Sequence, residues 1–180
     1  YALRRLGAAT SVLKLAAGAD DDVAGLPAGP YRFVETRTLP LIVSDGTAST
    51  FLIGKDGIAG DFRSATLAAT PEQNGAGDRL LLRNDFEIAV WSPDSGLRDT
   101  VTRLGSAITA ARWHPSGAYA AYATGEAITA IELDNRDAAN AYELVRAGSI
   151  LDFSIDADGR TLRFIGEIGN QKGLFERTLR

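Results

Sequence analysis

Several residue types are absent or scarce in this chain, and each absence excludes a class of protein. The 180 residues contain no cysteine, which excludes disulfides, zinc–thiolate sites and thiol catalysis. His114 is the only histidine, so a metal site built from several imidazoles is excluded too. The 19 basic residues are outnumbered by 23 acidic ones, giving a net charge of −4. Nucleic-acid-binding proteins are usually basic, and we therefore predict no nucleic-acid partner.

Long apolar runs are also absent. The most apolar stretch, residues 6–19, is rich in alanine and glycine and is broken by Lys14. A transmembrane helix needs about 20 apolar residues, so we predict no membrane span in this chain. Methionine is missing, including at position 1. We therefore expect a processed product or an excised fragment, and the compartment stays open.

The residues that are present form a repeat with a period of about 40 residues, as in known propeller repeats. Short β-branched and aromatic segments alternate with turns rich in glycine, proline and aspartate, a pattern that predicts strands and hairpins. The first strands of successive copies start near residues 64, 108 and 150, which are 44 and 42 residues apart. Four strands at this spacing are typical of a β-propeller blade. We predict an all-β fold of four-stranded antiparallel propeller blades.

The predicted blades occupy residues 31–180, at about 31–63, 64–104, 108–145 and 150–180, while 1–30 is a less regular segment compatible with part of a blade. Three to four blades fit the length, which leaves two arrangements open. One is a small four-bladed ring in which residues 1–7 supply the outer strand of the last blade. The other arrangement is part of a larger ring of six to eight blades, which are usual blade numbers. We favour this arrangement because the chain stops within a blade.

One segment sends conflicting signals. Residues 134–146 have the alanine-rich composition of a short helix, whereas the repeat predicts a loop over 134–140 and a strand over 141–145. Helix propensity is a weak predictor that longer-range constraints often override. We therefore favour the strand.

The turns of the repeat resemble those of a known family. Trp113–Ala123 (WHPSGAYAAYA) looks like the (F/W)-S-P-D-G-x-x-(I/L)-A-(Y/F) motif of TolB-type, WD-repeat-like propellers, with His114 and Ser116 in place of the usual serine and aspartate. Phe153–Leu162 looks like a second copy, and Ile88–Gly96 and Ile128–Asp134 resemble the third strand and its turn. Residues 80–180 are also similar to propeller regions of uncharacterised bacterial PEGA-domain proteins.

The resemblance implies a non-catalytic scaffold that binds a protein or peptide partner as part of a larger bacterial protein, and it favours a periplasmic or cell-envelope location. Two alternatives stay open. One is an accessory propeller domain of a hydrolase whose catalytic domain lies elsewhere, and the other is a structural component of the envelope or cell surface. The oligomeric state is not predicted.

Two acidic segments are candidate cation sites. Ser154, Asp156 and Asp158 match positions 1, 3 and 5 of a calcium loop, but Ile165 stands where the loop needs a bidentate glutamate, so we predict a hairpin turn. Asp20, Asp21 and Asp22 are predicted to mark an exposed loop, because no further ligands cluster near them.

His114 is the only candidate for a histidine base. No G-x-S-x-G nucleophile elbow accompanies it, and Ser116, two residues away on the same turn, is poorly placed for attack. We predict that His114 ends a strand and that its ring bonds to a backbone carbonyl or to a neighbouring blade.

The remaining polar and aromatic candidates have simple structural interpretations. Residues 75–77 (GAG) lack the Lys-Ser/Thr of a phosphate-binding loop, and Asp134, Arg136 and Asp137 form a mixed-charge loop. The aromatic residues are predicted to pack in the core, although Trp91 ends a strand and is a candidate for exposure. We predict no catalytic, cofactor-binding or metal-binding residue.

Overall fold

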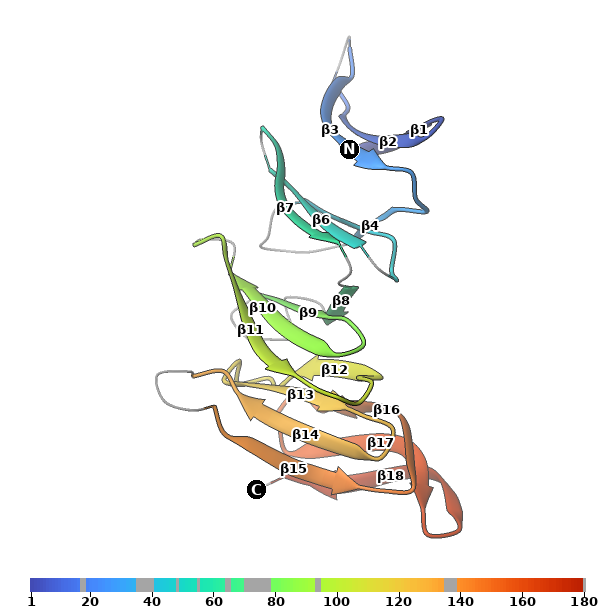
Figure 1. Ribbon diagram of the computed structural model, residues 1–180, viewed down its shortest axis with the longest axis vertical. Helices are drawn as coiled ribbons and strands as arrows, with labels where there is room; N and C mark the ends of the chain where they lie inside the picture. The colour runs from blue at the N-terminus through green and yellow to red at the C-terminus, as the bar shows by residue number, and fades with distance from the viewer. Residues whose placement is uncertain are drawn as a thin grey trace. The chain divides into compact units, whose positions relative to one another are not determined.

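All regular elements of the described residues are β-strands. The computed structural model describes residues 1–16, 19–34, 41–47, 49–54, 56–63, 66–69, 79–92, 95–134 and 139–179. Their strands form five antiparallel sheets, three with four strands and two with three (Figure 1). The predicted all-β fold of four-stranded antiparallel sheets is therefore confirmed, and the five sheets exceed the three to four blades predicted from length. In this part of the chain no helix is long and apolar enough to span a membrane.

The first compact unit, residues 1–67, contains two sheets. They comprise β1 (Ala2–Leu6), β2 (Ala9–Lys14) and β3 (Asp21–Pro27) in one, and β4 (Arg32–Val34), β5 (Leu41–Ser44), β6 (Ser49–Gly54) and β7 (Gly57–Arg63) in the other. A shared core of Val12, Leu26, Val43, Phe51 and Ile53 holds the two sheets together. In the four-bladed arrangement, residues 1–7 supply the outer strand of the last blade. In the structure this segment contains β1, which pairs with β2 within the first unit.

The second unit, residues 68–180, contains the other three sheets. These are β8 (Thr66–Ala69, starting just before the boundary), β9 (Leu80–Arg83), β10 (Glu87–Ser92) and β11 (Leu97–Arg103); then β12 (Ala110–Trp113), β13 (Tyr119–Ala123), β14 (Ala127–Glu132) and β15 (Ala141–Arg146); then β16 (Ser149–Ile155), β17 (Thr161–Ile168) and β18 (Gln171–Thr178). Residues 141–146 form β15, so the strand prediction is confirmed over the helical alternative.

Four of the sheets have a β-bulge at the same place, in the pairing of their last two strands, so the sheets can be aligned with one another. The register of the last strand pair shifts at Leu13 in β2–β3, Ile53 in β6–β7, Ala89 in β10–β11 and Thr129 in β14–β15. These positions are 40, 36 and 40 residues apart. By this alignment, β1–β3 correspond to the last three strands of a four-stranded sheet. The β16–β18 sheet instead corresponds to the first three strands, because its final pair, β17–β18, has no register shift.

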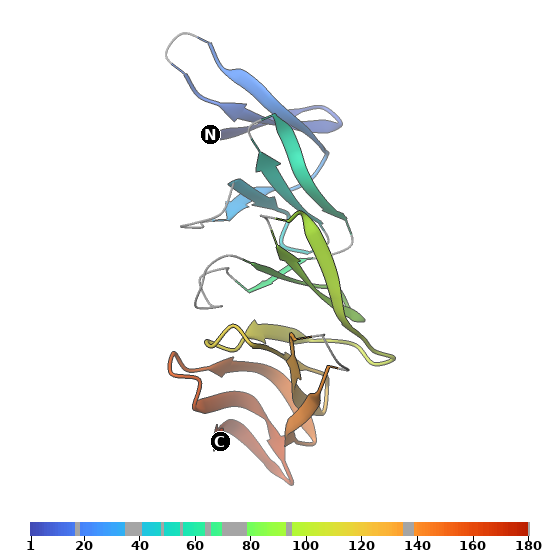
Figure 2. The same ribbon diagram turned by 90° about the vertical axis from the view of Figure 1, so that its left-hand side faces the viewer.

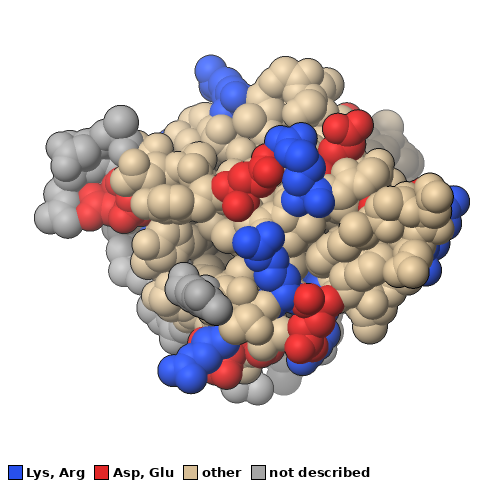
Figure 3. All heavy atoms as spheres, turned by 90° about the horizontal axis from the view of Figure 1, so that it is seen from below, with Lys and Arg blue, Asp and Glu red and all other residues tan. Residues whose placement is uncertain are grey.

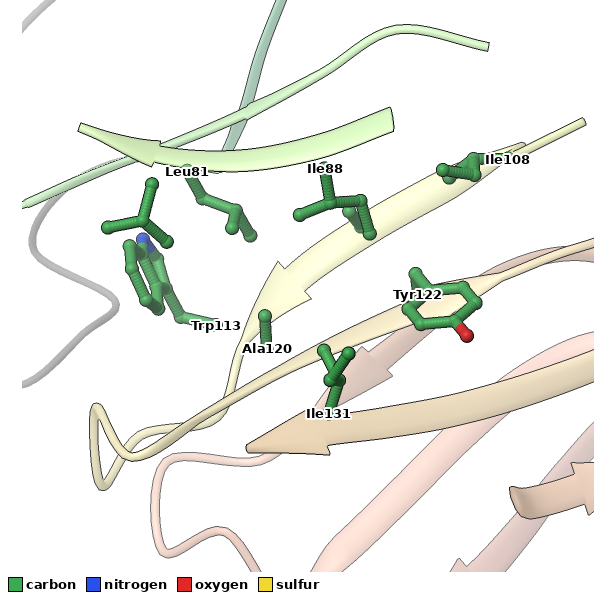
Figure 4. Packing of buried hydrophobic residues seen from close by; sticks show 9 residues of the cluster. Leu81, Ile88, Ile108, Trp113, Ala120, Tyr122 and Ile131 are labelled. Atoms are coloured by element: carbon green, nitrogen blue, oxygen red, sulfur yellow. The ribbon is translucent and has the colours of Figure 1, made fainter. Parts of the chain in front are cut away.

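The sheet β12–β15 packs on both of its faces. Ala120 and Tyr122 belong to a core shared with β9 and β10, whereas Ala121 and Ala123 belong to a core shared with β16 and β17. Leu81 and Ile88 point toward Trp113, Ala120 and Ile131 across the first of these interfaces (Figure 4). A strand that is buried on both faces has no reason to alternate apolar with polar residues. This explains the sequence AYA at 121–123.

The sheets β12–β15 and β16–β18 lie face to face (Figure 2). Their common core includes Ile128, Val145, Phe153, Leu162 and Phe164. Seen from below, the surface at the C-terminal end of this unit carries acidic and basic side chains next to one another among uncharged residues (Figure 3).

Candidate functional site

A hollow of the second unit lies between the sheets β12–β15 and β16–β18. Its volume is about 580 Å³, within the range of small-ligand and peptide side-chain pockets. Its walls are mostly apolar, with aromatic and cationic groups among them, and they comprise His114, Tyr119, Ala121, Ala130, Tyr142, Leu144, Ile155, Gly159, Arg160 and Leu179. We call this hollow the inter-sheet pocket.

Small side chains open the inter-sheet pocket. Ala121, Ala130 and Tyr142 are direct cross-strand neighbours on β13, β14 and β15, so they form a row on one face of the sheet. Alanine side chains do not fill the space between two sheets that pack about 10 Å apart. The outer end of the row is Tyr142, which is 50% exposed, so the pocket has an apolar floor and an aromatic entrance.

The imidazole of His114 is part of the pocket wall. Its Nδ1 accepts a hydrogen bond from the Ser116 backbone N–H (3.2 Å), which leaves the ring proton on Nε2. Nε2 then donates to the Gly159 carbonyl oxygen, 3.1 Å away in the turn between β16 and β17. We predict a bond from this ring to a backbone carbonyl or to a neighbouring blade, and the ring bonds to a backbone carbonyl that belongs to the next sheet.

Gly159 is required at this contact. Its φ of 74° lies in the left-handed region, where a side chain costs about 1–2 kcal/mol. A Cβ atom there would also lie 2.6 Å from Cε1 of His114. The turn and the packing of the histidine ring therefore both depend on glycine.

His114 and Ser116 lie closer together than we predict from the sequence. Ser116 Oγ is 2.8 Å from His114 Nδ1 and also accepts the Ala118 backbone N–H (3.2 Å). In a Ser-His-Asp triad, the second ring nitrogen donates to a carboxylate. Here it donates to the neutral carbonyl of Gly159, and both ring nitrogens are occupied. The pair therefore stabilises the turn between β12 and β13.

The Asp156 turn uses its carboxylates internally. Asp156 Oδ1 accepts the backbone N–H groups of Thr161 (2.9 Å) and Arg160 (3.0 Å), and Asp158 Oδ1 also accepts from Arg160 (2.8 Å). The Thr161 backbone N–H is the largest of the hydrogen-bond contributions that lower the pKa of Asp156 to about 2. The predicted hairpin turn is confirmed, and it carries Arg160 to the rim of the pocket.

The other candidates lie away from the pocket. Asp21 and Asp22 are exposed but begin β3, where Asp22 accepts a hydrogen bond from Ser11 (3.1 Å), so the predicted loop is wrong for these two residues. Trp91 is 5% exposed, which rules out the exposed strand end. Asp134 is exposed, whereas Arg136, Asp137 and residues 75–77 lie outside the described residues. Among those described, no group of three or more acidic or histidine side chains is placed to hold a metal ion.

The sequence did not predict most of the residues that line the pocket. Tyr142, Leu144 and Leu179 carry no motif, because they come from β15 and from the residue after β18, which meet only through tertiary packing. The alanine residues of β13 and β14 are the one local signal, since they predict a close or hollow sheet-to-sheet contact.

Comparison with known proteins defines the fold. No family model matches the chain, and no curated protein matches it. Similar solved structures include the Myceliophthora thermophila Cps50 (Swd1) β-propeller domain, with a TM-score of 0.58, 12% identity and coverage of 86% of this chain and 57% of that one. A chain of the mitotic checkpoint complex has a TM-score of 0.58 and 14% identity, with coverage of 99% and 62%. Hydrazine synthase of Kuenenia stuttgartiensis has a TM-score of 0.53 and 15% identity, with coverage of 80% and 47%.

These neighbours show that the chain has a β-propeller fold, and the first two are WD40-type propellers. The chain spans less than two thirds of the length of each of the three, as part of a propeller would. The narrower resemblance to TolB-type and PEGA-domain propellers stays a prediction.

Proposed function

We propose that this chain is a non-catalytic propeller scaffold that binds a protein or peptide partner, as part of a larger bacterial protein. We also propose that its sheets are successive blades, at about 31–63, 64–104, 108–145 and 150–180, preceded by a partial blade within 1–30. The recurrent bulge in the last strand pair supports this division, because it relates the sheets independently of their turns.

The inter-sheet pocket is the observation that carries the binding function. An apolar side chain of a partner fits over Ala130, against Leu144 and Leu179. The phenolic groups of Tyr119 and Tyr142 and the guanidinium of Arg160 supply hydrogen-bond donors for a carbonyl or carboxylate of the same partner. An apolar centre surrounded by aromatic and arginine side chains is typical of the energetically dominant part of protein interfaces.

An accessory role beside an enzyme is the second candidate function. One structural neighbour is hydrazine synthase, so propellers of this shape occur in enzyme assemblies. In this alternative the chain supports a hydrolase domain encoded elsewhere in the same protein, and a third alternative is a structural component of the cell envelope. The full gene distinguishes them, because it shows which domains accompany the propeller.

Peptide selection tests the binding function directly. The immobilised chain is used to select from a random peptide library, and the affinities of selected peptides are measured by calorimetry for the wild type and for Ala130→Trp. We expect the tryptophan to fill the pocket and to weaken binding about tenfold or more, as when an interface anchor is lost. Ala141→Trp is the matched control, because Ala141 is exposed on the neighbouring strand and does not line the pocket. No selected peptide, or equal affinity for the wild type and Ala130→Trp, would contradict the proposal.

A further inference from the structure

The β12–β13 and β16–β17 turns each accept a hydrogen bond from the sheet that precedes them in the chain. In both turns the acceptor is the carbonyl of a glycine with positive φ, Gly117 or Gly159. The Gly159 carbonyl oxygen accepts from Nε2 of His114 (3.1 Å). The Gly117 carbonyl oxygen accepts from Nη2 of Arg79, the residue directly before β9 (2.7 Å). The β12–β13 turn is therefore bonded both to the preceding sheet and to the following one.

The guanidinium of Arg79 contacts the β12–β13 turn on both sides of His114. Its central carbon is 5.3 Å from the centroid of the Trp113 ring, which is buried in the core directly before His114. The same guanidinium donates to the Gly117 carbonyl, three residues after His114. A hydrogen bond from an ionised donor is about twice as strong as a neutral one, and a cation over an aromatic face adds attraction. One side chain therefore holds the residues that flank His114.

The turn is closed tightly enough to carry this constraint to the His114 ring. Pro115 has its φ fixed by its own ring, and the Gly117 N–H donates to the His114 carbonyl oxygen (2.9 Å). Between them, the Ser116 N–H donates to Nδ1 of the imidazole (3.2 Å). Because these bonds join neighbouring peptide units, a displacement of the Gly117 carbonyl also displaces the Ser116 N–H. The position of the imidazole therefore depends on what holds Gly117.

We propose that Arg79 is a positioning residue for the inter-sheet pocket and that it acts through His114. Arg79 is not among the described residues that line this pocket, so it does not touch a ligand bound there. It holds the β12–β13 turn so that the His114 ring stays bonded to the Gly159 carbonyl and remains part of the pocket wall. The effect on a ligand rests on the proposed binding function, whereas the effect on the ring does not.

Arg103, on the same sheet as β9, provides a matched control. Its guanidinium donates to Glu87 on the neighbouring strand β10 (2.7 Å), and its side chain is 74% exposed. An exposed ion pair of this kind contributes little to stability. Replacing Arg103 by methionine therefore removes the same charge and the same length of side chain as the change at Arg79. It leaves the bonds of the β12–β13 turn in place.

Nuclear magnetic resonance of the single histidine tests the proposal without a ligand. The ring nitrogen shifts of His114 report its tautomer at mildly alkaline pH, where imidazoles are neutral. We expect the full chain to favour the Nε2–H tautomer about tenfold, as one hydrogen bond would. Arg79→Met should lower this preference about threefold, whereas Arg103→Met should leave it unchanged. Arg79→Lys keeps a cationic donor and should restore the preference to within about twofold of the wild type.

A change that only destabilises the protein would not alter the tautomer of its folded molecules, and circular dichroism checks that each variant is folded. Histidine signals that are the same in Arg79→Met and the wild type, or equally changed in Arg103→Met, overturn the proposal.

Peptide affinity gives a second measurement. A peptide selected by the wild type should bind Arg79→Met about threefold more weakly and Arg103→Met equally well. Equal affinity for Arg79→Met and the wild type overturns the effect on the pocket. If no peptide is selected, the binding function fails, and the histidine signals still decide whether Arg79 positions the ring.

Discussion

The sheets β12–β15 and β16–β18 begin alike and end differently. Both open with a strand, a turn and a strand, and both turns contain a glycine with positive φ, Gly117 at 71° and Gly159 at 74°. In both, this glycine N–H donates to the carbonyl three residues earlier, at His114 or Asp156. Yet β12–β15 has a core on each face, whereas β16–β18 shares a core with β12–β15 on one face and exposes apolar side chains on the other. The same local signals build both sheets, and their neighbours decide what is buried.

Removing equal amounts of apolar side chain from the two sheets should give the largest difference in the free energy of unfolding. Ile128 of β14 is fully buried and Leu151 of β16 is 70% exposed. We expect Ile128→Ala to lower the free energy of unfolding by about 3 kcal/mol, because it leaves a cavity between sheets. Leu151→Ala should cost less than about 1 kcal/mol. Urea denaturation measures both, and similar losses would mean that the face of β16–β18 is covered in solution.

The two turns should also differ in how they connect to the rest of the unit. His114→Ala removes the hydrogen bond to the Gly159 carbonyl and the bond that closes its own turn. We expect a loss of about 1–2 kcal/mol in the free energy of unfolding, as for a lost side-chain hydrogen bond that leaves a partner unsatisfied. Ser116→Ala, which touches only the turn, should cost less. Equal stability of the wild type and His114→Ala in urea would contradict the inter-sheet role of the ring.

The smallest effect should come from the Asp156 turn, and it should depend on pH. The pKa of Asp156 in the folded protein is about 2, below the value of about 3.9 for an unfolded aspartate. A carboxyl with a lowered folded pKa contributes stability that is fully present above about pH 4 and is lost as the pH falls toward 2. Asp156→Asn should therefore lower the thermal midpoint at neutral pH and leave it nearly unchanged at pH near 2. A midpoint difference that is the same at both pH values would rule out this explanation.

Turn chemistry made much of the fold predictable. The predicted strand over 141–145 is β15 (Ala141–Arg146), and the predicted hairpin turn at Ser154, Asp156 and Asp158 joins β16 to β17. Glycine and aspartate define such turns through short-range sterics and hydrogen bonds. Errors arose where contacts with other strands mattered. Trp91 at a strand end is buried, and Asp21 and Asp22 belong to β3 because they pair with Lys14 and Leu13.

The candidate site was only partly predictable. The His114 ring contact follows from a histidine beside a turn at the end of a strand, and Asp156 follows from its own turn. Tyr142 and Leu179 are separated by a whole sheet in the sequence and meet only when β15 and β18 come to opposite sides of one hollow. Nothing within either strand marks that meeting.

The order of residues alone determined that this chain forms short strands joined by glycine-containing turns, because those preferences act over a few residues. Tertiary structure alone decided that Ala121 and Ala130 open a hollow, and that Leu151 and Leu174 are exposed while Ile128 is buried. Burial depends on which sheet stands beside which, and that contact joins residues far apart in the chain, where local propensity has no influence.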